Sequence, residues 1–184
     1  MYEVIWHGRG GQGVVIAAQI LAESAYLQGF KGVTSAPTFG PERRGAPLTA
    51  STRISDAPIR TFSQIVKADI AVVLDYSLFG AVDILGSLKP GGLLIINTVR
   101  KPNEVDVQGN LRIATLDAAA IALKFHLLKE GAPIVNTPML GVFSKASGLV
   151  SLDYLEKGLK WKLSGTAAAT NIVALRAAYE ETNI

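Results

Sequence analysis

The sequence contains no cysteine among its 184 residues, and this absence removes several kinds of chemistry from the chain. Without cysteine there is no thiol nucleophile, no cysteine-ligated iron–sulfur cluster and no cysteine zinc site. Histidine is almost as scarce, since only His7 and His126 are present. Two histidines so far apart in the sequence make a poor metal site. We therefore expect this chain to supply neither a metal site nor a catalytic residue.

Charge is also sparse, because charged residues make up 18% of the chain and hydrophobic residues 49%. Asp69, Asp75, Asp83 and Lys89 interrupt the richest apolar stretch, so no membrane span is expected. The net charge of +3 is small and its basic residues are scattered, which argues against nucleic-acid binding. The N-terminal residues do not resemble a signal peptide, and a cytoplasmic location is expected. The apolar excess favours a large subunit interface in addition to a dense core.

Short apolar runs alternate with longer helical patterns along the chain. Strands are expected at Tyr2–His7, Gly32–Phe39, Leu48–Ile54, Ile70–Leu74, Leu93–Asn97 and Arg112–Leu116. Helices are expected at Val14–Gln28, Leu78–Leu88, Asp117–Leu128, 138–148, 152–160 and 166–181. This alternation predicts an α/β fold, a three-layer sandwich with a mostly parallel sheet covered by helices on both faces. No repeat or linker interrupts the pattern, so residues 1–184 are expected to form one domain.

A glycine-rich turn separates the first expected strand from the first expected helix, and it reads Gly8-Arg9-Gly10-Gly11-Gln12-Gly13. Glycines in the pattern G-x-G-x-x-G permit a sharp turn, and the helix N-terminus offers free N–H groups to an anion. We interpret these six residues as a candidate phosphate-binding turn. The alternative is a tight turn that only packs strand against helix. A plain NAD site is disfavoured, because no acidic residue lies between Glu23 and Glu42, where a ribose-binding carboxylate is expected.

A second polar loop, Phe39–Pro47, joins two expected strands and contains Glu42, Arg43, Arg44 and Gly45. At the carboxyl ends of the first strands this loop would face the glycine turn. Guanidinium groups bind phosphates through paired hydrogen bonds, so these four residues are candidates for the same site. The alternative is an ion-paired surface loop. Asn136 and Thr137 precede another expected helix, and helix capping is the first interpretation of both.

Together these motifs resemble the gamma subunit of pyruvate and 2-ketoisovalerate ferredoxin oxidoreductases. The resemblance rests on the glycine turn, on Phe39–Pro47 and on Arg53–Ile59. It continues through Ala68-Asp69, Leu74-Asp75, Ile96-Asn97, Asn136 and Leu140-Gly141, and so covers nearly the whole chain. The form Glu-Arg-Arg-Gly-Ala-Pro is similar to the pyruvate/ketoisovalerate branch rather than to the 2-oxoglutarate or indolepyruvate branches.

The resemblance implies a complex that decarboxylates a 2-oxoacid with thiamine diphosphate, passes electrons through iron–sulfur clusters to ferredoxin, and forms an acyl-coenzyme A. It implies that thiamine diphosphate, magnesium and the clusters belong to the alpha, beta and ferredoxin-like delta subunits, and that the gamma chain is inactive alone. For this chain it implies a part in coenzyme A binding and in assembly. A diphosphate and a separate 3′-phosphate suit a glycine turn plus an arginine loop.

Two other functions fit parts of the sequence. One is a free-standing NADP-dependent dehydrogenase in which Arg43 or Arg44 contacts the 2′-phosphate, and the other is a regulatory nucleotide-binding module. The missing ribose carboxylate, the lack of a Tyr/Lys or His/Asp catalytic set, and the apolar excess all favour the subunit.

Overall fold

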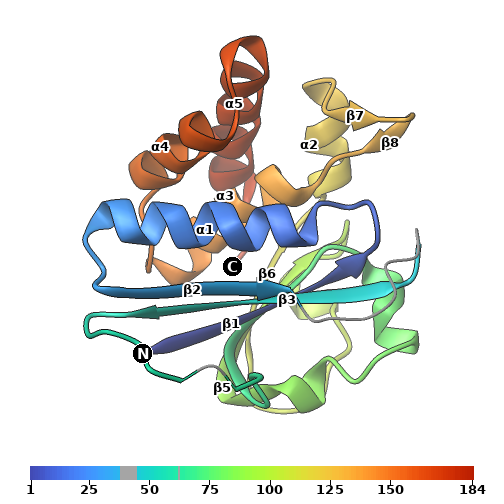
Figure 1. The fold of residues 1–184 in the computed structure, drawn as a ribbon. Helices are drawn as coiled ribbons and strands as arrows, with labels where there is room; N and C mark the ends of the chain where they lie inside the picture. The colour runs from blue at the N-terminus through green and yellow to red at the C-terminus, as the bar shows by residue number, and fades with distance from the viewer. Residues whose placement is uncertain (38–44, 62) are drawn as a thin grey trace.

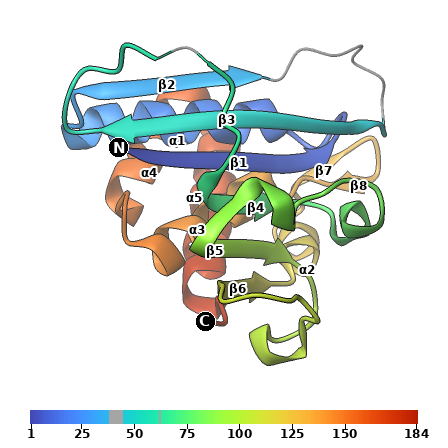
Figure 2. The same cartoon turned by 90° about the horizontal axis from the view of Figure 1, so that it is seen from below.

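The computed structural model describes residues 1–37, 45–61 and 63–184, which form a mixed α/β fold around a six-stranded sheet (Figure 1). The strand order is β2-β3-β1-β4-β5-β6. The strands are β1 (Tyr2–Arg9), β2 (Gly32–Pro37), β3 (Pro47–Ser55), β4 (Ala68–Val73), β5 (Leu88–Asn97) and β6 (Arg112–Leu116). Only β3 runs against the others, since it pairs antiparallel with both β1 and β2 (Figure 2). The predicted mostly parallel sheet is confirmed.

The two faces of the sheet are covered in different ways, with the α-helices gathered on one face (Figure 1). The helices are α1 (Val14–Gln28), α2 (Ala118–Lys124), α3 (Asn136–Ser147), α4 (Leu152–Lys162) and α5 (Gly165–Glu181). The other face carries the short 3₁₀ helices η1 (Tyr76–Gly80) and η2 (Leu85–Ser87), and a third, η3 (Pro102–Glu104), precedes Val105 in the same layer. A small hairpin, β7 (Leu128–Lys129) and β8 (Ala132–Pro133), follows α2. None of the helices in these ranges combines the length and apolarity needed to cross a membrane.

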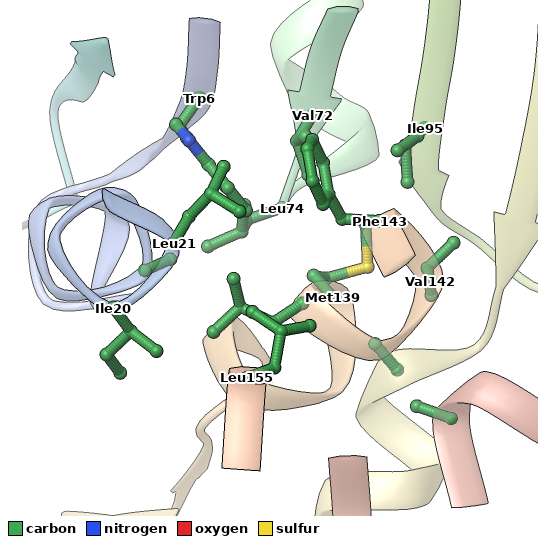
Figure 3. Close-up of a cluster of buried hydrophobic side chains, with 14 of the residues drawn as sticks. Trp6, Ile20, Leu21, Val72, Leu74, Ile95, Met139, Val142, Phe143 and Leu155 are labelled. Atoms are coloured by element: carbon green, nitrogen blue, oxygen red, sulfur yellow. The ribbon is translucent and has the colours of Figure 1, made fainter. Parts of the chain in front are cut away.

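The core forms because alternate residues of each strand point to opposite faces. Val72 faces the helical layer, whereas its neighbours Ala71 and Val73 face the 3₁₀ layer. Trp6 of β1 stacks on Phe143 of α3 with ring centroids 6.0 Å apart, and both side chains are fully buried (Figure 3). This aromatic contact joins the first strand to a helix more than 130 residues away in sequence.

One predicted helix is wrong, because the interval 78–88 contains the end of η1, the turn η2 and the start of β5 instead of an α-helix. Asp75 caps η1 by accepting from the Ser77 amide, and Asp83 accepts from the Gly86 amide, so each carboxylate begins a separate turn. Glycines at positions 80 and 86 also disfavour a continuous helix. The predicted Asp117–Leu128 helix is likewise shorter and ends at Lys124, since His126 has a φ of 55°, where a right-handed helix cannot continue.

Helices α3 and α5 approach each other closely at Gly141. A Cβ atom at this position would overlap the backbone carbonyl oxygen of Leu175 and lie 3.0 Å from the backbone nitrogen of Tyr179. Backbone atoms of a packed helix cannot move aside as a flexible side chain could. Gly141 is therefore required by packing and not by its backbone conformation.

We predict that Gly141→Ala destabilises the chain by about 1–3 kcal/mol, as expected when a methyl group is forced into a packed interface. Alanine in a helix interior otherwise stabilises relative to glycine, so the sign of the change is diagnostic. Gly80→Ala is the control, because a Cβ there meets nothing within 4 Å. The measurement is the urea midpoint of the purified chain. Equal midpoints for Gly141→Ala and wild type would contradict the close approach.

Candidate functional site: the glycine turn

The glycine turn lies at the carboxyl edge of the sheet, between the end of β1 and the start of α1. The chain runs from β1 through α1 to β2 on one side, whereas the parallel neighbour β4 lies on the other side (Figure 2). Such a reversal in strand order opens a crevice outside the carboxyl ends of the two central strands. In this chain the residues that follow β1 and β4 meet there.

Asp75, which follows β4 and Leu74, ties the glycine turn to the neighbouring strand. Its Oδ2 atom accepts hydrogen bonds from Arg9 Nε at 3.0 Å and from Gln12 Nε2 at 3.1 Å. Its Oδ1 atom accepts from the amide of Ser77 at 3.0 Å and from Ser77 Oγ at 2.6 Å. Gln12 also accepts from the Arg9 amide through Oε1 at 2.8 Å. The carboxylate therefore fixes both polar side chains of the turn.

The charge on Asp75 is stabilised by these partners. Partial burial acts to raise the pKa of Asp75, but the hydrogen bonds from Ser77 and Gln12 and the positive charge of Arg9 outweigh it and lower the pKa overall. The ionised form is thus favoured in the folded state. The stability it supplies is present above the ordinary pKa and is lost only as the pH falls through the lowered value.

The described end of the second polar loop is bonded directly to the glycine turn. Gly10 donates from its amide to the Ala46 carbonyl at 2.9 Å, and Gly45 donates back to the Gly10 carbonyl at 3.2 Å. Arg9 Nη1 also donates to the Gly45 carbonyl at 3.0 Å. The expected proximity of this loop and the turn is confirmed at Gly45. The candidate residues Glu42, Arg43 and Arg44 lie outside the described residues.

Helix α1 begins directly after the turn and presents unpaired backbone donors. Gly13 is its N-cap, with a φ of 79° that favours glycine, and no side chain caps the helix. The amides of Gly13, Val14 and Val15 have no acceptor in the part of the chain that the structure describes. Free N–H groups at a helix N-terminus attract anions, because the macrodipole adds to their partial positive charge. The geometry therefore suits a phosphate.

Asn136, which is distant in sequence, contacts the glycine turn. Its Nδ2 atom lies 3.4 Å from the Gly13 carbonyl oxygen, and a Cβ atom at Gly13 would lie 2.5 Å from that same Nδ2. Val135 is the N-cap of α3 and Asn136 is its first residue, whose Oδ1 atom accepts from the Thr137 amide at 2.8 Å. Asn136 is therefore not the N-cap residue, although its side chain does bind one of the first amides of the helix, whereas Thr137 donates from Oγ1 to Asn171 Oδ1 at 2.7 Å. The position of Asn136 in the sequence gave no sign of a contact 123 residues away.

The structure assigns different parts to the six predicted turn residues. Gly8 is buried, and a Cβ there would overlap the Val14 side chain, so its role is in packing. The side chains of Arg9 and Gln12 are engaged with Asp75. Gly10, Gly11 and Gly13 form the backbone of the turn, and Gly11 is exposed with a φ of 98°. Sequence reasoning missed Asp75 and Ser77, although a carboxylate directly after a buried parallel strand is a usable signal.

His7 is the buried ionisable group nearest to the turn in sequence. The residue is 5% exposed, its Nδ1 atom has no hydrogen-bond partner in the described structure, and its Nε2 atom lies 3.4 Å from Ser87 Oγ. Burial lowers the pKa of His7 from 6.5 to about 4. The ring is neutral at pH 7, as its burial requires.

His7 should make the free energy of unfolding depend on pH. Between pH 6.5 and about 4 the unfolded chain binds a proton at His7, whereas the folded chain does not. The free energy of unfolding therefore decreases as the pH falls through this window, and the contribution of His7 levels off below it. The pKa difference corresponds to a loss of about 3 kcal/mol. Urea unfolding at successive pH values measures it. His7→Gln should flatten the slope between pH 6.5 and 4, whereas His126→Gln, at an exposed position, should leave it in place. An unchanged slope in His7→Gln would contradict the assignment.

With this geometry in view, comparison with known proteins identifies the class as an α/β oxidoreductase subunit. The family model "Pyruvate ferredoxin/flavodoxin oxidoreductase" matches residues 3–181. The pyruvate/ketoisovalerate oxidoreductases common subunit gamma of Pyrococcus furiosus is 47% identical, over 100% of this chain and 98% of that protein. The chain belongs to the pyruvate ferredoxin/flavodoxin oxidoreductase family.

Solved structures agree with this assignment. Subunit PORC of pyruvate oxidoreductase from Thermotoga maritima superposes with a TM-score of 0.79 at 33% identity, over 99% of this chain and 97% of that chain. A 2-oxoglutarate:ferredoxin oxidoreductase from Magnetococcus marinus, solved with coenzyme A bound, matches with a TM-score of 0.74 at 17% identity. It covers 97% of this chain but only 31% of that longer one, and the likeness shows the fold alone.

Proposed function

We propose that this chain is the gamma subunit of a 2-oxoacid:ferredoxin oxidoreductase, and that it contributes to coenzyme A binding and to assembly of the complex. The complex would oxidatively decarboxylate pyruvate or a branched-chain 2-oxoacid to an acyl-coenzyme A. The observation that carries the coenzyme A part is the braced glycine turn, whose helix amides at Gly13, Val14 and Val15 have no acceptor in the described structure.

A phosphate at this turn would be bound by backbone groups, because the Arg9 and Gln12 side chains are engaged with Asp75. The diphosphate of coenzyme A is the natural occupant of a helix N-terminus. Glu42, Arg43, Arg44 and Gly45 complete the proposed site, with Arg43 or Arg44 taking the 3′-phosphate. This part of the proposal is supported by the hydrogen bonds between Gly45 and the glycine turn, which hold the described end of the loop at the same edge.

The redox cofactors are proposed to lie on partner subunits. This chain has no cysteine to hold an iron–sulfur cluster. We therefore place thiamine diphosphate, magnesium and the clusters on alpha, beta and ferredoxin-like delta subunits, with ferredoxin as electron acceptor in the cytoplasm. Residues 1–184 serve in this proposal as one domain of the assembly.

The first test of this function is dependence on partners. We predict that the purified chain does not oxidise pyruvate or 2-ketoisovalerate with coenzyme A and a viologen acceptor, and that adding its native partner subunits restores the reaction. Native mass spectrometry of the complex from its own cells would identify those subunits. Turnover by the chain alone, free of contaminating subunits, would overturn the proposal.

The second test concerns Gly13. In the assembled enzyme, Gly13→Val should raise the KM for coenzyme A at least about tenfold, because the side chain meets Asn136 and displaces the turn that carries the free amides. The KM for the 2-oxoacid should not change. Gly29→Val is the matched control, since Gly29 also has a positive φ but lies at the other end of α1 with nothing within 4 Å of its Cβ. Equal coenzyme A kinetics in the two variants would make the turn purely structural.

A further inference from the structure

Arg100 lies at the same edge of the sheet as the glycine turn, in the loop that follows β5. Its Nη1 atom donates to the Tyr76 hydroxyl at 3.0 Å, and its Cζ atom lies 5.1 Å from the centre of the Tyr76 ring. Tyr76 directly follows Asp75, and the next residue, Ser77, accepts from Arg9 Nη2 at 2.7 Å. Arg100 is therefore joined to the glycine turn through adjacent residues of one loop.

Among the described residues the charge of Arg100 has no acidic partner, in contrast to that of Arg9. Arg9 pairs with Asp75 at 3.0 Å, and Arg53 pairs with Glu3 at 3.1 Å. No carboxylate among the described residues pairs with Arg100, and the one hydrogen bond that its guanidinium makes to them goes to a neutral hydroxyl. A guanidinium has five N–H donors, so most of those on Arg100 remain free for a ligand.

Tyr76 prepares Arg100 for binding without neutralising it. The hydroxyl fixes one end of the guanidinium, and the ring attracts its positive charge. The ring of Phe79 packs against Tyr76 with centroids 5.3 Å apart, which limits the movement of the tyrosine. A positioned side chain loses less conformational entropy on binding than a free one, and this favours affinity.

We propose that Arg100 binds a phosphate group of coenzyme A, and that Tyr76 positions it. The binding site then extends along the carboxyl edge, from the glycine turn past the end of β4 to the end of β5. This inference rests on the proposed coenzyme A function and adds a residue to its site. Coenzyme A has phosphates at two separate places, the diphosphate and the 3′-position, and a site with separated anion-binding groups suits that arrangement.

The test compares Arg100→Gln and Arg100→Lys in the assembled enzyme, with Arg112→Gln as control. Arg112 is another exposed arginine without a carboxylate partner among the described residues, and it lies at the opposite, amino edge of the sheet, at the start of β6. Arg100→Gln should raise the KM for coenzyme A about tenfold or more, the expected effect of losing a charge-assisted hydrogen bond. Arg100→Lys should lie between it and wild type, and Arg112→Gln should match wild type. The KM for the 2-oxoacid should stay constant throughout.

Dephospho-coenzyme A identifies the phosphate. A loss seen with coenzyme A but not with the dephospho compound places Arg100 on the 3′-phosphate, and equal losses place it on the diphosphate; both support the proposal. Tyr76→Phe, which keeps the ring and removes the hydroxyl, should give a smaller loss of the same kind. Wild-type kinetics in Arg100→Gln, or equal effects of Arg100→Gln and Arg112→Gln, would overturn it. If Gly13→Val still raises the KM in that case, the turn binds coenzyme A without Arg100; if it does not, the coenzyme A part of the proposed function fails as well.

Discussion

The Asp75 carboxylate holds the glycine turn in its observed shape, because all four of its hydrogen bonds come from residues that follow the ends of β1 and β4. Two come from the turn itself, through Arg9 and Gln12, and two from Ser77. Hydrogen bonds to an ionised group are stronger than neutral ones, although partial exposure to water limits their contribution. This single anion therefore joins the end of β1 to the end of β4. Because Asp75 also pairs with the positive charge of Arg9, the attraction for an anionic ligand has to come from other groups.

Helix α3 connects this turn to the core of the protein. Its first residue, Asn136, lies against Gly13, and two turns further on Phe143 stacks on Trp6 in the strand that leads into the turn. The same helix thus contacts both ends of the segment that carries the site. At Gly141, between these two contacts, close packing against α5 leaves no room for a side chain. The position of the turn is therefore set by core packing as well as by the polar contacts of Asp75.

The sequence was a good guide to those features that depend on local pattern. The six strands of the main sheet lie where their apolar runs predicted, and the glycine turn falls between β1 and α1, whereas the short hairpin β7–β8 was not predicted. The interval 78–88 was misjudged, because its apolar spacing resembles a helix while Asp75 and Asp83 divide it into separate turns. The contacts of Asp75 and Asn136 with the turn span 63 and 123 residues. Such contacts depend on how strands and helices pack in three dimensions, which periodicity does not encode.

The electrostatic difference between the two edges of the sheet explains why the carboxyl edge suits an anion. At the amino edge a cavity of about 410 Å³ is lined by Lys89, Arg112 and Asp69, together with the end of α3 around Gly148. Lys89 there is paired with Asp69 at 2.9 Å, and the carbonyl end of a helix carries partial negative charge that offsets the cation of Arg112. At the carboxyl edge α1 presents its amide end, whose partial charge is positive, and Arg100 lies at the same edge without a carboxylate partner among the described residues. Arg112 and Arg100 thus lie at opposite ends of helix dipoles. At the carboxyl edge the dipole of α1 and the charge of Arg100 both attract a phosphate, whereas at the amino edge the dipole of α3 opposes the charge of Arg112.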